Sequence, residues 1–484
     1  MYTRTKDYPM YLAGEWAPGE SEARMEATSP STGERIGTVP EGTRADVRRA
    51  ISAANEAWSG WAALSAFERA AVMVRIAQII EERRDDLAET LTLDQGKPLA
   101  AEAHDEVDEL VRYFEMAGAD VTRMEGAMPP SVDADKRVML YRVPRGVVGV
   151  ISPWNWPYTM PAELIAPALA CGNAVVWVPA PSTSVCAVKL AECIVDAGLP
   201  PGLFNMITGP GPVVGDEVAA NPGTQAVGFI GSVETGQKVA SRAAGKTLLL
   251  EMGGNGPMVI LDDADLDAAA EASLTSAFLG AGQSCTAGER FLVHERIYDA
   301  YLDKLGGAIG RGVRLGDPFD PLTTLGPLNN EPTAEKMDLH VSDALEGGAE
   351  LVTGGNRAEG FPTDLYYRPT VLGRVTDEMR VSKEETFGPI IPASVIRDEE
   401  AAIRAINSSP YGLLSAVFTR DLARGLRFAE AVRTGWVNVN ASSNHWESHL
   451  PFGGRAGSSS GIGRVGGRYA METFTELKTV IVSM

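Results

Sequence analysis

One cysteine in this chain lies in a stretch that is suited to chemistry rather than to packing. Cys285 occurs in GAGQSCTAGER, residues 280–290, among glycines, a glutamine, a serine and a threonine. Cys171 ends an apolar run, and Cys186 and Cys193 lie on a helical pattern, which is typical of free cysteines that act as small buried hydrophobes. The thiol of Cys285 could reach a ligand, so it is a candidate nucleophile. A surface cysteine without a role is the other interpretation of this stretch.

The size and composition limit the classes of protein to consider. A chain of 484 residues exceeds one ordinary core, which predicts two or three domains. Its net charge of −21 argues against a nucleic-acid or anionic-membrane partner. Four cysteines without a C-x-x-C pair predict neither a disulfide framework nor a metal site. The N-terminal stretch has no apolar signal segment and no window reaches eighteen apolar residues, so we expect a cytoplasmic protein without membrane spans.

The stretch from Val147 to Leu250 alternates short β-rich runs with helical patterns. It predicts about five strands and four helices, in a parallel sheet covered on both faces. Within it, FIGSVETG runs a strand into Gly231 and Ser232, with a helix beginning near Glu234. Glycine lets the backbone approach a pyrophosphate and a helix N-terminus offers free N–H groups, although a plain turn is the alternative. Ligands bind at the carboxyl ends of such strands.

Other segments complete the expected organisation. Residues 45–118 hold long charged helical patterns, and a second α/β series starts near residue 257. The C-terminal ELKTVIVS reads as a strand that joins a sheet in another element or another subunit. Gly461, Gly463 and Gly466 fit G-x-G-x-x-G, but no βαβ unit surrounds them, so we interpret this match as chance.

Six motifs occur in a fixed order along the chain. They are PWNWP (153–157), FIGSVETG (229–236), LEMGGNGP (250–257), GQSCTAGER (282–290), EETFGP (384–389) and PFGG (451–454). Together they resemble the NAD(P)-dependent aldehyde dehydrogenase superfamily, over nearly the whole chain.

The resemblance implies an α/β, aldehyde dehydrogenase-like fold with three parts. A parallel-sheet cofactor domain is expected from residues 1–122 and 145–252, and an α/β catalytic domain from 253–458. A small β oligomerisation element would combine 123–144 with 459–484 and build a homodimer or homotetramer.

The resemblance also implies a division of catalytic roles. Cys285 matches the family's nucleophile, and aldehyde oxidation by hydride transfer needs such a thiolate to attack the carbonyl. The amide of Asn155 is expected to stabilise the oxyanion, or else to satisfy a turn. Glu251 matches the base that activates water against the thioester, and its place after an apolar run predicts a raised pKa. An exposed strand-end glutamate is the alternative for Glu251. Glu476 matches a carboxylate often assigned to proton relay, with a plain surface charge as the alternative.

The cofactor site that the resemblance implies departs from the family at one place. Glu385 and Phe387 match the positions that hold the nicotinamide ribose, although Phe387 also fits a core aromatic. The other expected contacts are Ile151, Pro153, Trp154, Ser182, Gly231 and Ser232. The family usually has lysine where Val178 stands and often glutamate where Pro181 stands. The choice between NAD and NADP therefore stays open, with a slight preference for NAD.

The expected aldehyde tunnel follows the PWNWP motif and a late loop. Its predicted walls are Trp156, Met160, Glu163, Trp446 and Phe452. Family members that act on carboxylate-bearing semialdehydes often place an arginine where Glu163 stands. A buried carboxylate would repel an anionic substrate, whereas aromatic walls favour neutral, aromatic or cationic aldehydes. Glu163 could instead form a salt bridge elsewhere, and Arg455 is then the nearest candidate for an anionic tail.

Four other functions remain to be compared with oxidation of a neutral aldehyde. A CoA-acylating or a semialdehyde dehydrogenase would share most motifs, although Glu251 argues against transfer to CoA. A catalytically silent relative is disfavoured because Cys285, Asn155, Glu251 and Glu385 occur together. A cysteine hydrolase lacks a plausible histidine partner, since the chain has five histidines and none lies near the motifs except His445 and His449 in the late loop.

Overall fold

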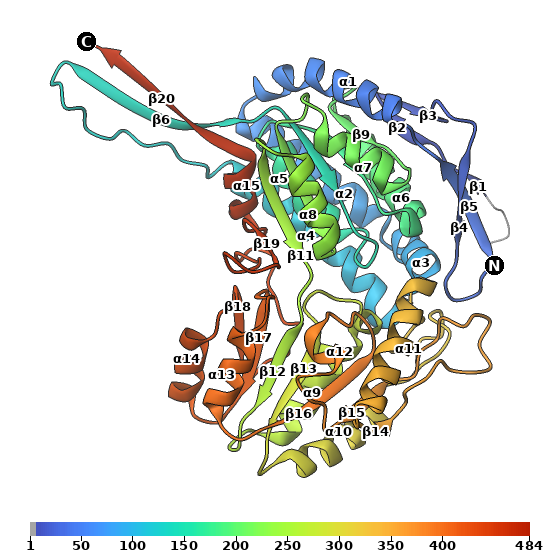
Figure 1. The fold of residues 1–484 in the computed structure, drawn as a ribbon. Coiled ribbons are helices and arrows are strands. Elements are labelled where there is room, and N and C mark those ends of the chain that lie inside the picture. The colour runs from blue at the N-terminus through green and yellow to red at the C-terminus, as the bar shows by residue number, and fades with distance from the viewer. Residues whose placement is uncertain (1–5) are drawn as a thin grey trace.

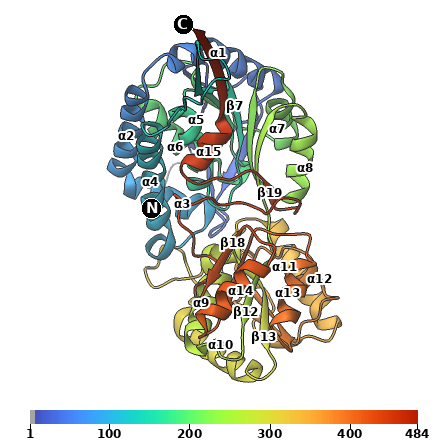
Figure 2. The ribbon, with the colours of Figure 1, turned by 90° about the vertical axis from the view of Figure 1, so that its left-hand side faces the viewer.

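The computed structural model describes residues 6–484, which form two α/β bodies and a projecting arm (Figure 1). The first body is built on an eight-stranded sheet and the second on a seven-stranded sheet. Figure 2, turned by a quarter, shows the two bodies stacked one above the other. None of the helices in residues 6–484 combines the length and apolar character that crossing a bilayer requires.

The eight-stranded sheet has a parallel centre and antiparallel edges. In spatial order its strands are β19 (Gly461–Ile462), β11 (Thr247–Met252), β10 (Ala226–Gly231), β7 (Val147–Ile151), β8 (Ala174–Val178), β9 (Phe204–Met206), β2 (Met10–Leu12) and β3 (Glu15–Ala17). The five strands from β7 to β11 are parallel, which confirms the predicted alternating unit. The edge strand β19 pairs antiparallel with β11, with Leu250 opposite Ile462. Part of the glycine-rich segment therefore belongs to this sheet.

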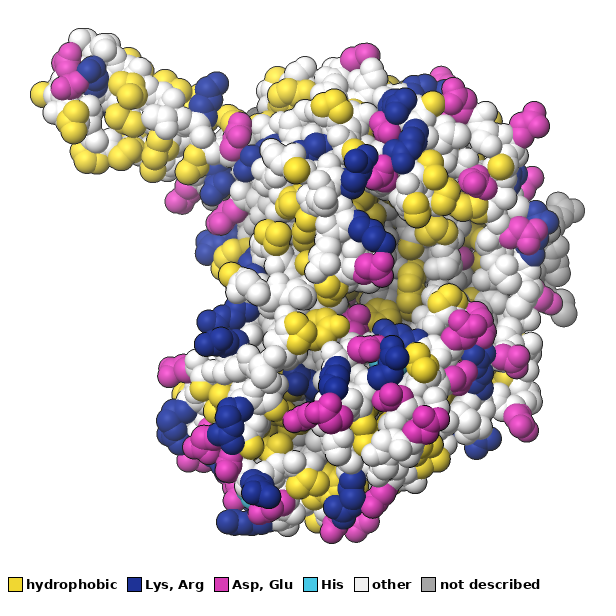
Figure 3. Space-filling view, in the orientation of Figure 1, with side chains coloured by type: hydrophobic (Ala, Val, Ile, Leu, Met, Phe, Trp, Pro, Cys, Tyr) yellow, Lys and Arg dark blue, Asp and Glu magenta, His cyan; other side chains and the backbone are white. Residues whose placement is uncertain are grey.

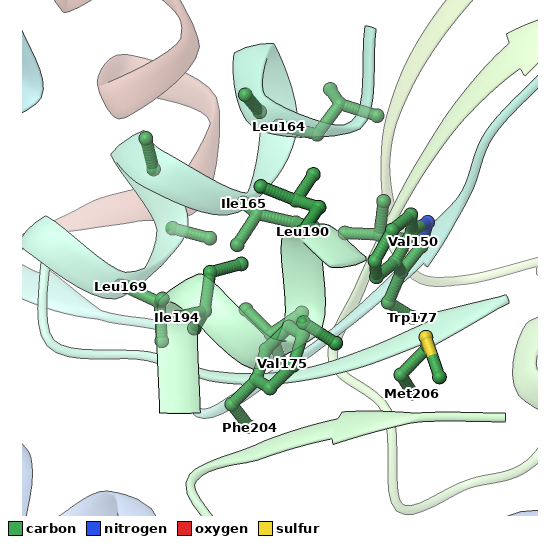
Figure 4. Packing of buried hydrophobic residues seen from close by; sticks show 14 of the residues in the cluster. Val150, Leu164, Ile165, Leu169, Val175, Trp177, Leu190, Ile194, Phe204 and Met206 are labelled. Carbon is green, nitrogen blue, oxygen red and sulfur yellow. The ribbon is translucent and has the colours of Figure 1, made fainter. Parts of the chain in front are cut away.

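Four crossover helices connect these parallel strands, as the sequence predicts. They are α5 (Thr159–Ala170), α6 (Ser184–Asp196), α7 (Gly211–Ala220) and α8 (Val233–Arg242). Figure 4 shows how apolar side chains of α5 and α6 pack against the sheet, with Leu164 and Leu190 near Val150 and Trp177. Continuous apolar strands such as AVVWV are buried along their whole length because helices cover both sides.

The N-terminal helices cover one side of this body. They are α1 (Arg44–Ala62), α2 (Ala66–Glu82), α3 (Arg84–Gln95), a π-helical turn (Leu99–Ala103) and α4 (His104–Val121). Capping boxes begin two of them, where Thr43 pairs with Asp46 and Ser65 with Glu68. Helix α3 ends at Gly96, whose φ of 101° lies in the left-handed region that favours glycine. A separate three-stranded sheet contains β1 (Lys6–Asp7), β5 (Arg35–Pro40) and β4 (Arg24–Thr28).

The second body repeats the α/β principle in the second half of the chain. Its strands in order are β14 (Glu350–Thr353), β15 (Thr370–Gly373), β16 (Ile390–Ile396), β13 (Gly288–His294), β12 (Gly256–Ile260), β17 (Leu414–Phe418) and β18 (Trp436–Val439). Only β14 runs antiparallel to its neighbour among these strands. The helices are α9 (Leu266–Phe278), α10 (Tyr298–Gly312), α11 (Glu331–Glu346), α12 (Arg380–Lys383), α13 (Glu399–Asn407) and α14 (Leu422–Ala431).

The arm is a two-stranded antiparallel ribbon that extends from the first body. Strand β6 (Lys136–Pro144) pairs with β20 (Thr475–Ser483) over its full length, after the short helix α15 (Arg468–Phe474). The predicted C-terminal strand therefore finds its partner in β6 of the same chain. Figure 3 shows hydrophobic side chains along this projecting arm.

Candidate active site

A cavity of about 550 Å³ lies where the two bodies meet. The carboxyl ends of β7, β8, β10 and β11 form one side, and loops of the second body form the other. Fifteen of the predicted site residues line it: Ile151, Pro153, Trp154, Asn155, Trp156, Met160, Glu163, Gly231, Ser232, Glu251, Cys285, Glu385, Phe387, Trp446 and Phe452. Segments as far apart in sequence as Ile151 and Phe452 thus converge on one site.

The loop that carries Cys285 has an unusual backbone. It follows a 3-10 turn at Leu279–Gly282, in which Gly280 and Ala281 have φ values of 60° and 55°. Asn444 holds the flanking hydroxyls, because its Oδ1 accepts from Ser284 at 3.0 Å and from Thr286. The small residues around the thiol are therefore fixed from a neighbouring loop and do not fill the space in front of it.

The electrostatic surroundings of Cys285 keep its thiol protonated at rest. Burial raises the pKa of Cys285 well above its usual value, and the carboxyls of Glu385, Glu251 and Glu163 raise it further. A thiol in such a site needs a nearby group that accepts its proton before it can attack a carbonyl.

Asn155 lies beside this loop, and one of its two amide hydrogens already forms a hydrogen bond within the protein. Its Nδ2 donates to the backbone oxygen of Gln283 at 2.9 Å, and the residue is buried. A primary amide has two N–H donors, so one remains for an acceptor in the cavity.

Glu251 lies near the carboxyl end of β11, beside the cavity, and its carboxyl is buried without a hydrogen-bond partner from the described part of the protein. Both carboxyl oxygens lack a hydrogen bond to any of the described residues. Burial raises the pKa of Glu251 well above its usual value, the carboxyl of Glu163 adds to the rise, and Arg464 opposes it. A carboxyl of this kind accepts a proton readily near neutral pH.

Glu163 is neutral near pH 7 and is not part of a salt bridge. Burial raises the pKa of Glu163 to about 8, against the effect of a hydrogen bond from the Tyr113 hydroxyl to its Oε1 at 3.0 Å. Neither expectation from the sequence describes it fully, since it is neither a charged wall nor an ion-paired residue. The phenol of Tyr113 was not identifiable from the sequence because it lies 50 positions away on α4.

The other end of the cavity has the features that a dinucleotide requires. Glu385 lines the cavity and accepts the Gly254 N–H at 3.0 Å through one carboxyl oxygen, so its carboxyl is held in place at the cavity wall. Phe387 has a left-handed φ of 62° and contacts Trp154 edge-on at 5.5 Å between ring centroids. Ser232 caps α8 by accepting the Thr235 N–H at 3.3 Å. The residues present fit a nicotinamide dinucleotide, with Val178 and Pro181 also in the lining.

Two predicted residues lie outside this arrangement. The described residues that line the cavity include neither Ser182 nor Glu476. Ser182 lies in a 3-10 turn beside Pro181, which does line the cavity. Glu476 lies on β20 and pairs with Arg145 at 3.4 Å, as a surface charge would.

Several lining residues were not identified from the sequence. They include Lys336 and Thr333 on α11, Asn330 at its N-terminus, and Asn444 in the late loop. Lys336 is the one lysine or arginine among the described lining residues. No motif marks these positions, although Ser284 and Thr286 could have been inferred from their place beside Cys285.

Comparison with known proteins agrees with this geometry. The aldehyde dehydrogenase family model matches residues 16–480. The chain is 38% identical over 475 residues to the NADP+-dependent succinate-semialdehyde dehydrogenase of Escherichia coli, covering 98% of this chain and 97% of that protein. A crystal structure of a succinate-semialdehyde dehydrogenase from Burkholderia pseudomallei superposes with a TM-score of 0.96 at 39% identity, over 100% of this chain and 98% of that one. That of an NAD-dependent aldehyde dehydrogenase from Sinorhizobium meliloti gives 0.95 at 35% identity, over 100% and 96%. The chain therefore belongs to the aldehyde dehydrogenase family, as an NAD(P)-dependent enzyme.

Proposed function

We propose that the enzyme oxidises a neutral apolar or aromatic aldehyde to the carboxylic acid by way of a thioester on Cys285. The observation that carries this proposal is that a thiol, a free amide N–H and an unpartnered carboxyl line one cavity, at Cys285, Asn155 and Glu251. Nucleophile, oxyanion donor and base are the groups that acyl transfer requires.

The first step belongs to Cys285 and Asn155. The Cys285 sulfur attacks the aldehyde carbon after its proton has passed to the Glu251 carboxylate, forming a thiohemiacetal whose oxygen carries the negative charge. The remaining Asn155 N–H stabilises that oxygen, together with the backbone N–H of Cys285. NAD+ or NADP+, held by residues such as Glu385 and Phe387, would supply the hydride acceptor for conversion of the thiohemiacetal to a thioester on Cys285.

The second step belongs to Glu251. After Glu251 has released the thiol proton to solvent, its carboxylate takes a proton from water, and the oxygen of that water attacks the thioester carbon. The carbon–sulfur bond breaks, the acid leaves, and the thiol of Cys285 is restored. A CoA-acylating reaction would not need this base, so dependence of acyl release on added CoA would contradict the assignment of Glu251.

The substrate class follows from the aldehyde end of the cavity. Trp156, Met160, Trp446 and Phe452 give it apolar walls. Glu163 adds a carboxyl that is mostly protonated at neutral pH. The one lysine in the lining, Lys336, acts on Glu385 at the dinucleotide end, and neither Arg455 nor any other arginine lines the described cavity. A carboxylate tail on the substrate would find no cation here.

Two of the similar proteins described above are succinate-semialdehyde dehydrogenases, which favours a second candidate substrate, succinate semialdehyde. The two candidates are separated by measuring kcat/KM for benzaldehyde, hexanal, an aminoaldehyde and succinate semialdehyde with both cofactors. We expect a neutral aldehyde to exceed succinate semialdehyde by about tenfold or more, which is about 1.4 kcal/mol in the transition state. A tenfold preference for succinate semialdehyde would replace the apolar class with the relatives' class.

A further inference from the structure

A buried lysine lies behind the aldehyde end of the cavity. The side chain of Lys97 is 1% exposed, forms an ion pair with Glu106, and places Nζ 3.6 Å from the ring centroid of Trp156. An ammonium over an aromatic face is attracted most strongly where water is excluded. Among the described residues, Lys97 is thus the cation that contacts a predicted tunnel wall.

Glu106, the ion-pair partner of Lys97, also binds the backbone that follows Asn155 and Trp156. Glu106 also accepts the backbone N–H of Tyr158 at 3.1 Å and that of Thr159 at 3.4 Å, at the start of α5. α5 directly follows the segment that carries Asn155 and Trp156. Lys97 and Glu106 therefore hold the indole and the beginning of α5 together from behind.

A second acidic residue of the same segment holds the cysteine loop. Glu102, in the π-helical turn after Lys97, accepts the Gly280 N–H at 3.1 Å on each carboxyl oxygen. Gly280 lies against the Trp156 ring so closely that a Cβ at this position would be 3.0 Å from it. The indole is thereby in contact with both the ammonium of Lys97 and the backbone that leads to Cys285.

We propose that Lys97 is a positioning residue that sets the width of the aldehyde tunnel by fixing the Trp156 indole. This inference rests on the proposed function, in which Trp156 forms a wall of that tunnel. With the ammonium in place, the ring keeps one orientation and presents one surface to the substrate. Without it, the ring gains conformational freedom and the long substrates that contact it lose a preformed wall. Short aldehydes, which react at Cys285 without reaching this wall, are affected little.

The variants must separate this role from that of a plain buried ion pair. Removing Lys97 alone would leave the Glu106 charge buried and unpaired, which is strongly destabilising. The test variant is therefore K97M/E106Q, which removes both charges, and its control is E106Q, in which the nearby carboxyl of Glu102 remains as a counter-charge that keeps the ammonium over the ring. A glutamine at position 106 retains an oxygen that can accept the Tyr158 N–H in both proteins.

The first readout does not depend on activity. The enzyme is labelled with 5-fluorotryptophan, and the fluorine line of Trp156 is identified by its loss in W156F. We expect E106Q to keep a narrow line near the wild-type position, and K97M/E106Q to shift and broaden it. Coincident Trp156 lines in the two variants would overturn the proposal.

The second readout is the split between KM and kcat for two aldehydes. We expect K97M/E106Q to raise KM for hexanal about tenfold relative to E106Q, while KM for propanal changes less than about twofold. In a W156L background, K97M/E106Q should have no selective effect on the KM for hexanal relative to E106Q, because the wall that Lys97 fixes is gone. Equal changes for both aldehydes, or a selective effect that persists in W156L, would also overturn it. A wild type that oxidises no aldehyde would instead refute the proposed function, while the fluorine line still decides whether Lys97 holds Trp156.

Discussion

At the scale of single residues, the four thiols differ in whether they reach the cavity, whereas the pKa of each is raised. Burial raises the pKa of Cys171 and of Cys193 to about 12, raises that of Cys186 well above its usual value, and raises that of Cys285 as well. Only Cys285 among them lines the cavity. Under the proposed mechanism its reactivity therefore depends on a proton acceptor in that cavity and not on a standing thiolate, and Glu251 would fill this role in addition to activating water.

Replacing Cys285 with alanine should abolish aldehyde oxidation and leave the fold intact, because the thiol faces a cavity rather than the core. Dehydrogenase rate and thermal unfolding measure the two effects. The matched control is Cys193→Ala, which removes a fully buried thiol and should lower stability by about 0.5–3 kcal/mol while activity persists. More than a few per cent of wild-type kcat in the Cys285 variant would contradict its role as nucleophile.

Replacing Glu251 with glutamine should separate hydride transfer from acyl release. Rapid mixing with cofactor and aldehyde should give a burst of about one NADH or NADPH per site, followed by slow turnover, because the thioester forms but water is not activated. If the variant shows no burst and a full steady-state rate, another group is the base.

The titration of Glu163 gives a prediction in pH with a definite sign. Its pKa of about 8 lies above the usual value of a glutamate, so the carboxyl is neutral below pH 8 and negative above it. An anionic aldehyde is repelled by the negative form only. The ratio of kcat/KM for succinate semialdehyde to that for hexanal should therefore fall as pH rises through about 8.

The control for this pH dependence is Glu163→Gln, which cannot ionise. It should remove most of the fall in the ratio, while steps shared by the two aldehydes cancel in both proteins. An equal fall in the variant would assign the effect to Glu251 or another cavity group.

At the scale of elements, the sequence predicts what repeats and misses what is irregular. The series from β7 to β11 follows from apolar, β-branched runs alternating with helical patterns, and each appears in the structure. Strand β19 was not predicted, because two residues flanked by glycines carry no periodic pattern and gain their partner only through β11. The left-handed φ of Phe387 is likewise invisible in EETFGP, since that conformation is set by tertiary contacts.

Site residues follow the same division. Cys285, Asn155 and Glu251 lie in motifs that can be read locally, whereas the Lys97–Glu106 pair and Tyr113 act across the fold from separate helical segments. Their contacts depend on how α4 and α5 pack, which no spacing along the chain encodes.

The end of β8 gives a prediction about cofactor choice. Val178 and Pro181 line the cavity and supply neither a cation for a 2′-phosphate nor an acid against it. We expect NAD+ and NADP+ to differ by less than about a hundredfold in kcat/KM, equivalent to about 2.7 kcal/mol. Steady-state kinetics with one aldehyde and each cofactor measures the ratio, and strict dependence on one would show that another residue reads the 2′ position.

At the scale of the whole molecule, the arm is the surface that most needs a partner. No further strand joins the β6–β20 ribbon among the described residues; the edge of β6 carries one isolated bridge, between Leu140 and Ala127. A two-stranded ribbon alone is marginally stable in water. Leu477 and Ile481 are exposed on it, at 61% and 59% (Figure 3). We propose that these side chains and edges pack against another subunit, in a homodimer or homotetramer.

The double substitution L477R/I481R should therefore weaken self-association. Charges placed in an apolar contact oppose its burial, so sedimentation or light scattering should show a smaller species than the wild type at equal concentration. The control L422R/L426R alters two exposed leucines of α14, away from the arm, and should leave the arm contact in place. An unchanged mass for the arm variant would place the subunit contact elsewhere.

The position of β19 also determines when the enzyme becomes competent during synthesis. The strand that carries Glu251 is completed on its outer side by residues 461–462 of a 484-residue chain, with Glu251 aligned to Gly461. A ribosome that has made the cysteine loop and the whole second body has still not made this neighbour. Folding of the first body from the N-terminus can begin early, but its edge at β19 can close only after residues 461–462 have been made. Under the proposed mechanism, a nascent chain would therefore contain Cys285 before the edge strand beside Glu251 is in place, and before either proton transfer from the thiol or release of the acid could be completed.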